Sequence, residues 1–296
     1  MKPIDENLGN IIGLLQEKIW GSQAERRLFE DHGLKIAPAN FYSNLPTLAE
    51  IESSFEYKVE MPYIDHPIFP SFQDVSFLLP YSEKFPKSFF HKEFHKGNDQ
   101  FQGIDAIALF SMIGSKKPRR IIEIGSGFST LVALEAIRIF KLETEIICID
   151  PFPRPFVRKL IGVQLIEKPV QEISLEFFQN NLEDGDFFFI DSTHTVKTGS
   201  DCLHLYLRIL PSLTKKLFYH AHDIFLPAGL PKEWLMNLHI YWTEQYLLLA
   251  LLSDVKKYKF EFGSNFAHLK SPLELTKLFG KEPVVLGGSF WWSSYS

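Results

Sequence analysis

Residues 119–130 read Arg-Arg-Ile-Ile-Glu-Ile-Gly-Ser-Gly-Phe-Ser-Thr and carry the pattern that decides the fold. The apolar part predicts a buried strand that runs directly into a glycine loop, and a helix is expected from residue 129. Glycine lets the backbone approach a ligand closely, and a helix start presents free N–H groups. Because parallel sheets bind ligands at the carboxyl ends of their strands, this loop predicts the floor of a nucleotide-like site.

The chain around this loop alternates short apolar segments with helical patterns. We predict an α/β fold with a doubly wound, mostly parallel sheet, since near-continuous apolar strands need helices on both faces. The expected strands are 119–125, 145–150, 163–167, 186–191, 216–223, 257–263 and 283–292, and the expected helices are 129–140, 174–182, 198–210 and 243–254. About twenty residues between the last two strands leave room for a short helix or an antiparallel return.

The chain of 296 residues is 45% hydrophobic and 15% aromatic, which is a globular composition. The sequence pattern changes near residue 100, from an irregular segment rich in proline and aromatic residues to an alternation of apolar strand patterns and helical patterns. We therefore expect an N-terminal extension over 1–100 and a ligand-binding domain over 101–296. The extension contains one clear helix pattern, 8–20, and many aromatic residues. These aromatics serve either for packing, which we favour, or as a substrate lid.

Several classes of protein are disfavoured. The two cysteines, Cys148 and Cys202, have no disulfide-framework spacing, so we expect a reducing, cytoplasmic environment. No apolar run approaches the roughly 20 residues that span a bilayer, and no membrane partner is expected. The net charge is −5 without a basic block, which argues against a nucleic-acid partner.

The residues near the glycine loop suit a particular ligand. Asp150 ends the next strand, where a carboxylate can accept hydrogen bonds from ribose hydroxyls. Glu123 is expected to point into the same crevice. A dinucleotide loop needs a third glycine, and Thr130 takes that position here, which disfavours NAD. The expected cofactor-binding residues are Glu123, Gly125, Ser126, Gly127, Ser129, Thr130, Asp150 and Asp191.

These motifs resemble those of a known family. The segment 123–127 followed by Asp150 resembles motif I and the ribose-binding acid of class I S-adenosylmethionine-dependent methyltransferases. Residues 189–201 (Phe-Ile-Asp-Ser-Thr-His-Thr-Val-Lys-Thr-Gly-Ser-Asp) and 220–227 (His-Ala-His-Asp-Ile-Phe-Leu-Pro) resemble a small-molecule subgroup. The resemblance implies S-adenosylmethionine as cofactor, a seven-stranded sheet with an antiparallel last strand, and residues 167–170 near the adenine.

Two polar clusters end the fourth and fifth expected strands, at residues 191–194 and 220–223. We expect both beside the glycine loop. Methyl transfer to a hydroxyl needs a group that removes its proton, and histidine suits this because its pKa lies near neutrality. His194 is the preferred base for O-methylation of a small molecule, His222 is second, and Asp191 can orient the imidazole.

A divalent metal is the competing use of these side chains. Asp191, Asp223 and His222 could hold Mg²⁺, although His222 stands where related magnesium enzymes often have another acid. The histidines could also simply be hydrogen-bonded. Glu244 and Gln245 either reach this pocket or only begin a helix. A nicotinamide-dependent oxidoreductase and a non-catalytic binding module are the alternative functions.

Overall fold

The computed structural model describes residues 6–40, 42–279 and 287–295 and divides the chain into two compact units, 1–54 and 55–296. The first unit contains α1 (Glu6–Lys18), α2 (Gln23–Asp31) and α3 (Leu48–Ser53). The helix expected over 8–20 is thus present as α1. Helix α2 begins at a capping box, in which Ser22 accepts a bond from the Glu25 N–H and Glu25 accepts from the Ser22 N–H.

The division at residue 54 differs from the boundary we expected near residue 100. Aromatic side chains of the segment 55–100 belong to the hydrophobic core of the second unit. Phe89 stacks on Phe94 with 3.8 Å between ring centroids, and Phe69 stacks on Phe266 at 5.4 Å. Both Phe89 and Phe94 are buried. Burying these rings stabilises the α/β unit, so the segment folds as part of it.

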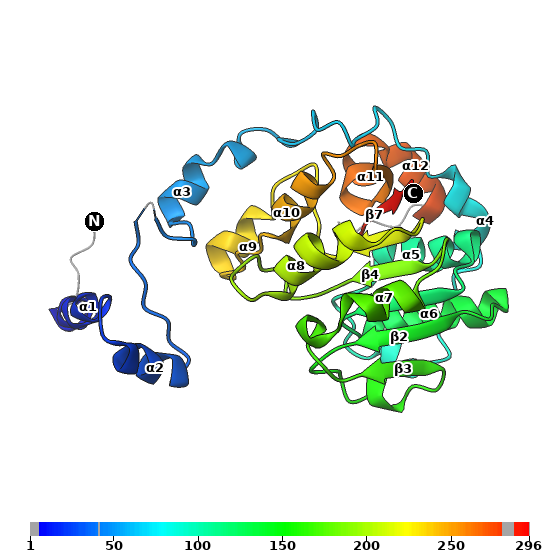
Figure 1. Cartoon of the computed structure of the whole chain (residues 1–296). Helices are drawn as coiled ribbons and strands as arrows, with labels where there is room; N and C mark the ends of the chain where they lie inside the picture. The colour runs from blue at the N-terminus through cyan, green and yellow to red at the C-terminus, as the bar shows by residue number, and fades with distance from the viewer. Residues whose placement is uncertain (1–5, 41, 280–286, 296) are drawn as a thin grey trace. The chain divides into compact units, whose positions relative to one another are not determined.

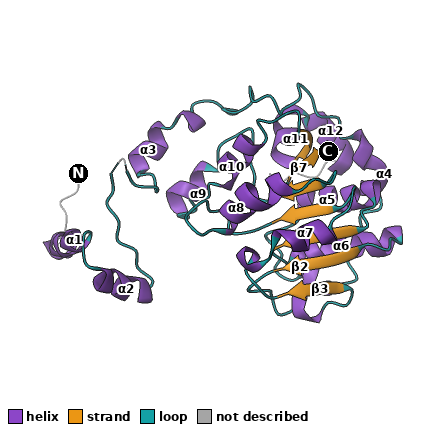
Figure 2. Cartoon of the chain, viewed as in Figure 1, coloured by secondary structure: helices purple, strands orange, loops and turns teal. Residues whose placement is uncertain are grey.

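The second unit is built on one sheet, whose strands are orange in Figure 2. The sheet has seven strands in the order β3-β2-β1-β4-β5-β7-β6. Only β7 runs antiparallel to its neighbours, β5 and β6. This confirms the predicted fold class, including the antiparallel last strand. The strands are β1 (Arg120–Ile124), β2 (Glu145–Ile149), β3 (Val163–Ile166), β4 (Phe187–Ile190), β5 (Phe218–Ala221), β6 (Tyr258–Gly263) and β7 (Phe290–Ser294). Residues 283–286 of the last expected strand lie outside the described residues.

Alternate strand residues face two different cores. One core contains Ile121 and Phe187 and is covered by α5 (Gly103–Lys116) and α6 (Phe128–Phe140). The opposite core contains Ile122 and Phe188. It is covered by helix α7 (Leu175–Asn181), the π-helical turn Leu205–Ile209 that continues α8 (Asp201–His204), and α10 (Glu244–Leu251). The layers are visible in Figure 1.

Three expected helices are confirmed as α6, α7 and α10, and the fourth is present as α8 with its π-helical turn. Other helices were not expected. Helix α5 precedes β1, and α9 (Lys232–Asn237) follows β5. Helices α11 (Ser264–Lys270) and α12 (Pro272–Phe279) fill the interval between β6 and β7, where the sequence allowed a short helix. Within the described ranges, none of the helices combines the length and apolar character needed to cross a membrane.

Four parallel strands end level with one another. In the sheet register, Ile124 of β1 pairs with Ile149 of β2 and with Ile190 of β4, and Ile190 pairs with Ala221 of β5. The loops that begin at residues 125, 150, 191 and 222 therefore leave the sheet along one edge. This edge is where open α/β sheets bind ligands.

Candidate active site

Two cavities lie along this edge of the sheet. The first, the glycine-loop cavity, has a volume of about 420 Å³ and is lined by residues that include Gly125, Ser126, Asp150 and Val170. The second, the histidine cavity, has a volume of about 710 Å³ and is lined by His194, His222 and Asp223 among others. Residues 191–193 line both cavities. A molecule bound in one cavity therefore adjoins a molecule bound in the other.

Residue 125 must be a glycine because the backbone at the end of β4 lies very close to it. Its φ is +90°, and a Cβ atom added there would lie 2.1 Å from the carbonyl oxygen of Asp191. Any side chain at residue 125 would push β1 and β4 apart at the point where the two cavities meet. The glycine that the sequence singled out thus serves the tight packing of two strand ends.

Glu123 does not reach the crevice, contrary to our expectation. Its side chain is buried beneath the start of α6, where it accepts hydrogen bonds from Ser129 Oγ, from Thr130 Oγ1 at 2.8 Å and from Cys148 Sγ at 3.3 Å. Strand alternation explains this, because Glu123 shares the face of Ile121 that α6 covers. Burial raises the pKa of Glu123 to about 7, although the three hydrogen bonds lower it. Ser129 and Thr130 consequently serve the protein's own carboxyl group.

Asp150 stands where the sequence placed it, at the end of β2 and on the wall of the glycine-loop cavity. Ser126 Oγ donates to its Oδ2 at 2.5 Å, and the Phe152 N–H donates to its Oδ1 at 2.8 Å. Gly127 is the N-cap of α6 and does not line the cavity within the described residues. Residues 169–171 form another part of the wall, and they overlap the segment expected near an adenine.

The histidine cavity combines a polar floor with an aromatic wall. Phe225, Trp234 and Trp242 line it, and their rings meet edge to face at centroid distances of 5.1 and 5.4 Å. The Trp242 ring lies 4.3 Å from that of His194. Among the described residues, no lysine or arginine lines this cavity. Such a wall suits a flat or apolar face of a small molecule.

His194 lies at the centre of a carboxylate cluster and is buried. Its Nδ1 lies 2.8 Å from Glu244 Oε2, and its Nε2 lies 3.4 Å from Asp191 Oδ1 and 3.5 Å from Asp223 Oδ2. Burial lowers the pKa of His194, but the hydrogen bonds that its ring donates to Asp191 and Glu244 outweigh this and raise it to about 10. Asp191 behaves conversely: burial raises its pKa, but the charge of His222 and the bond to His194 hold it at about 2.

Glu244 is itself held by Tyr206. The buried Tyr206 hydroxyl donates to Glu244 Oε1 at 2.6 Å, and Tyr206 belongs to the π-helical turn after α8. Such turns often occur at functional sites, because they re-aim side chains within a helix. Tyr206, Glu244 and His194 therefore form one hydrogen-bonded chain that fixes the imidazole.

His222 has a carboxylate partner of its own. Its Nε2 lies 3.2 Å from Oδ2 of the buried Asp105, which comes from α5. Asp105 also accepts bonds from Ser264 Oγ at 2.7 Å and from the N–H groups of Gly288 and Ser289 at 3.0 Å. Burial raises the pKa of Asp105, but the bond and charge of His222 hold it at about 2. His222 Nδ1 remains directed toward Asp191 and Asp223, at 3.8 and 3.6 Å.

The third histidine of this edge, His220, belongs to the core. It is fully buried, stacks on Phe189 with 3.9 Å between centroids, and pairs with Ser289 Oγ at 2.9 Å. Burial lowers the pKa of His220 well below its usual range. His220 therefore packs within the core, whereas His194 and His222 line a cavity.

Side chains of the kinds that bind metal ions lie close together in the histidine cavity. Ligand atoms of Asp191, His194 and Asp223 lie within 4.8 Å of one another. The set expected from the sequence contained His222 in place of His194, and both histidines face the two aspartates.

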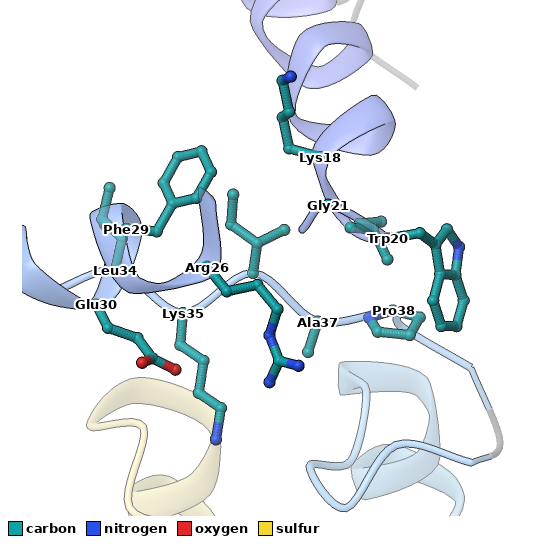
Figure 3. Close-up of a pocket in the computed structure, with 12 residues that line it drawn as sticks. Lys18, Trp20, Gly21, Arg26, Phe29, Glu30, Leu34, Lys35, Ala37 and Pro38 are labelled. Carbon is teal, nitrogen blue, oxygen red and sulfur yellow. The ribbon is translucent and has the colours of Figure 1, made fainter. Parts of the chain in front are cut away.

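In the first unit, a smaller cavity of about 290 Å³ is lined by Lys18, Arg26, Glu30 and Lys35 (Figure 3). It contains none of the expected site residues.

Residues 122–224 match the family model of a methyltransferase domain. The chain is also 32% identical over 163 residues to an uncharacterized protein from Archaeoglobus fulgidus, covering 50% of this chain and 74% of that relative. The chain belongs to the class I S-adenosylmethionine-dependent methyltransferases. This methyltransferase therefore has the fold and the enzyme class that its motifs predicted.

Two methyltransferases are among the solved structures to which the chain has a weak similarity. One is the plantazolicin methyltransferase BpumL in complex with SAH, at 15% identity and a TM-score of 0.40, covering 74% of this chain and 95% of that chain. The other is the SAH-bound methyltransferase PaMTH1 of Podospora anserina, at 17% identity and a TM-score of 0.34, covering 86% and 99%. At these scores, neither adds weight to the family assignment.

Sequence reasoning missed several residues of the site. Asp105 lies in a helix that is apolar nearly all round, so no periodic pattern marked it. Asp201 accepts bonds from the Thr193 N–H at 2.9 Å and from Thr193 Oγ1 at 2.6 Å, which fixes the shared wall. Trp234 and Trp242 lie in a segment without a recognisable chemical pattern. Glu244 was not missed, since it was expected either to reach this pocket or to begin a helix, but its partner His194 could not be inferred from its place at a helix start.

Proposed function

We propose that this methyltransferase transfers the methyl group of S-adenosylmethionine to an oxygen atom of a small molecule. The observation that carries the proposal is the wall formed by residues 191–193, which the two cavities share. A donor in the glycine-loop cavity would present its methyl group across this wall to an acceptor in the histidine cavity. Adjacent cavities of this kind hold two reactants in line, which is the main catalytic need of methyl transfer.

The donor would lie with its amino-acid portion on Gly125 and Ser126. Its ribose hydroxyls would donate to Asp150, and its adenine would lie by residues 169–171. Thr130 argues against a nicotinamide dinucleotide, since its hydroxyl bonds Glu123 and accepts from the Gly127 N–H at 3.0 Å, where that motif has a glycine. The third possibility, a non-catalytic binding module, is disfavoured by the histidines that line the second cavity.

The acceptor would be uncharged or cationic. The histidine cavity has carboxylates and an aromatic wall, and its described lining contains no lysine or arginine that would bind an acid. In the transfer, the sulfonium C–S bond breaks, an O–C bond forms, and the hydroxyl proton leaves. His194 Nε2 is our candidate for the proton acceptor in the neutral form of the ring, and its raised pKa means that this form becomes abundant only as the pH approaches about 10. His222 is the second candidate, and Glu244 and Asp191 orient His194. The two free, buried cysteines are compatible with a cytoplasmic enzyme.

Calorimetry with S-adenosylmethionine and S-adenosylhomocysteine tests the donor site. Asp150→Ala should weaken binding by about 1.5–3 kcal/mol, the range for hydrogen bonds to a charged group. Ser126→Ala is the milder companion variant, because it removes only one hydrogen bond of Asp150. A protein that binds neither compound contradicts the proposal, and fluorescence titration with NADH then tests the nicotinamide alternative.

The second candidate for activating the hydroxyl is a divalent cation held by Asp191, Asp223 and His222. A cation polarises a bound hydroxyl and favours loss of its proton. The specific observation in its favour is that both cavity histidines face both aspartates. If His194 took the place of His222 among these ligands, it would no longer act as the base.

A further inference from the structure

We propose that Arg154 binds the carboxylate in the amino-acid portion of S-adenosylmethionine, and that Gln100 holds the Arg154 guanidinium in position. This inference rests on the proposed function, because that proposal lays the amino-acid portion over Gly125 and Ser126. It goes further by naming a residue that distinguishes S-adenosylmethionine from an analogue without the carboxylate.

The glycine-loop cavity has a negatively charged lining without a cationic side chain. Asp150, Asp191 and Asp201 line it, and no lysine, arginine or histidine does so among the described residues. These aspartates suit the two positive groups of the donor, the sulfonium and the ammonium. The donor's carboxylate binds most strongly to a charged N–H donor. Such a donor has to come from a segment that adjoins the cavity lining.

Arg154 belongs to the loop that adjoins this lining. Pro151 and Phe152 line the cavity, and the chain reaches Arg154 two residues later. The Arg154 Cζ atom lies 5.0 Å from the centroid of the Phe128 ring. A Cβ atom added to Gly127 would lie 3.8 Å from Arg154 Nε. The guanidinium therefore lies beside the end of the glycine loop, next to the two residues assigned to the amino-acid portion.

A turn before α5 holds the guanidinium from the other side. Arg154 Nη2 donates to Oε1 of Gln100, which lines the histidine cavity. Asn98 fixes this turn, because its Oδ1 accepts from the Phe101 N–H at 3.0 Å and its Nδ2 donates to the Phe101 carbonyl at 2.8 Å. The Phe101 ring is buried, 4.9 Å from that of His222. Arg154 thus connects the loop after β2 to an anchored turn at the acceptor cavity.

Among the described residues, Arg154 has no carboxylate partner. The ion pairs that arginines form with glutamates there involve Arg120, Arg138 and Arg158. The contacts of Arg154 are instead an amide oxygen and an aromatic ring, which are both neutral. Its side chain is exposed, and a guanidinium keeps further N–H donors in a planar fork that matches a carboxylate. Arg154 is therefore held in place with its charge and most of its donors available to a ligand.

Calorimetry on the whole chain with S-adenosylmethionine and decarboxylated S-adenosylmethionine tests the proposal. The decarboxylated compound keeps the sulfonium and the ammonium and lacks only the carboxylate. Wild type should prefer S-adenosylmethionine about 10–100-fold, the range for hydrogen bonds between charged groups. Arg154→Ala should lower the affinity for S-adenosylmethionine by this factor and should not lower that for the decarboxylated compound.

Two further variants test how the guanidinium acts. Arg154→Lys should restore part of the preference, because lysine keeps the charge without the planar fork. Gln100→Ala should reduce the preference less than Arg154→Ala does, since the guanidinium remains and loses only its anchor. Arg208→Ala is the matched control, because Arg208 is likewise exposed, has no ion pair among the described residues and lines neither cavity. Its two affinities should equal those of wild type.

Circular dichroism of each variant separates loss of the carboxylate contact from loss of the fold. If a folded Arg154→Ala variant lost affinity for both compounds equally, Arg154 would only support the loop, and the proposal would be overturned. An unchanged affinity of this variant for S-adenosylmethionine overturns it as well. A wild-type protein that binds both compounds equally retains the proposed function and loses only this inference. A wild-type protein that binds neither contradicts the proposed function too.

Discussion

The two cavities are built in different ways. The glycine-loop cavity comes mainly from short loops that directly follow β1, β2 and β4, so most of its wall segments continue a strand. The histidine cavity draws Asp105 from α5, His222 from the end of β5, Trp234 from α9 and Gly288 from the approach to β7. Where the loops that line a site directly follow strands, the sequence motif itself shows which side chains line that site. A site assembled from distant segments depends on the whole fold.

The largest expected effect comes from the point where the two cavities meet. Gly125→Ala should lower the free energy of unfolding by about 2–5 kcal/mol, combining left-handed backbone strain with a clash against the Asp191 carbonyl. It should also abolish S-adenosylhomocysteine binding, because the loop must move. Urea denaturation and calorimetry measure the two effects.

Gly185→Ala is the matched control for this variant. Gly185 has the same φ of +90°, but no atom lies within 4 Å of an added Cβ. In the control, the free energy of unfolding should fall only by the cost of placing a non-glycine residue at positive φ, about 1–3 kcal/mol, and ligand binding should be normal. Equal destabilisation by the two substitutions would mean that the close approach of β1 and β4 contributes nothing.

A second test concerns the carboxyl group beneath the glycine loop. The pKa of Glu123 is raised from 4.5 to about 7, so the folded state binds this proton more tightly than the unfolded state. The protonated Glu123 carboxyl group therefore stabilises the fold fully below pH 4.5. This stabilisation, about 3 kcal/mol for the shift in pKa, is lost as the pH rises through about 7. In Glu123→Gln this loss should disappear. The variant should therefore gain about 3 kcal/mol relative to wild type between pH 4.5 and pH 8.

Urea denaturation at several pH values measures this difference. Ser129→Ala provides a companion variant, because removing a donor to the carboxylate raises the pKa of Glu123 further and should widen the pH range of the loss. A constant difference between Glu123→Gln and wild type across this range would show that the buried carboxyl group has an ordinary pKa.

The contrast between the cavities also explains what the sequence could predict. The strands, the sheet class and the positions of Gly125 and Asp150 follow from local patterns, since each strand leads directly into its loop. The orientation of Glu123 was wrong, because alternation along β1 turns it under α6. Helix α5, and with it Asp105, was missed because a helix buried on nearly all sides lacks an amphipathic pattern. The pairing of Glu244 with His194 spans 50 residues, and only the folded chain brings them together.

The smallest expected effect tests whether the histidine cavity can be weakened without disturbing the glycine-loop cavity. Tyr206→Phe removes the hydroxyl that donates to Glu244 Oε1 and leaves a buried carboxylate oxygen without that donor. The free energy of unfolding should fall by about 1–3 kcal/mol. Tyr258→Phe is the control, because the buried Tyr258 hydroxyl has no hydrogen-bond partner among the described residues. Its effect should stay within about 0.5 kcal/mol.

Ligand binding by Tyr206→Phe provides the decisive comparison. Tyr206 contacts the chain that fixes His194, and it does not line the glycine-loop cavity among the described residues. S-adenosylhomocysteine affinity should therefore match that of wild type, while the rate of methyl transfer to an identified acceptor falls because Glu244 holds His194 less firmly. If donor affinity and transfer rate fell by the same factor, the two cavities would behave as one cooperative unit. The shared wall at residues 191–193, fixed by Asp201, would then transmit the change from one cavity to the other.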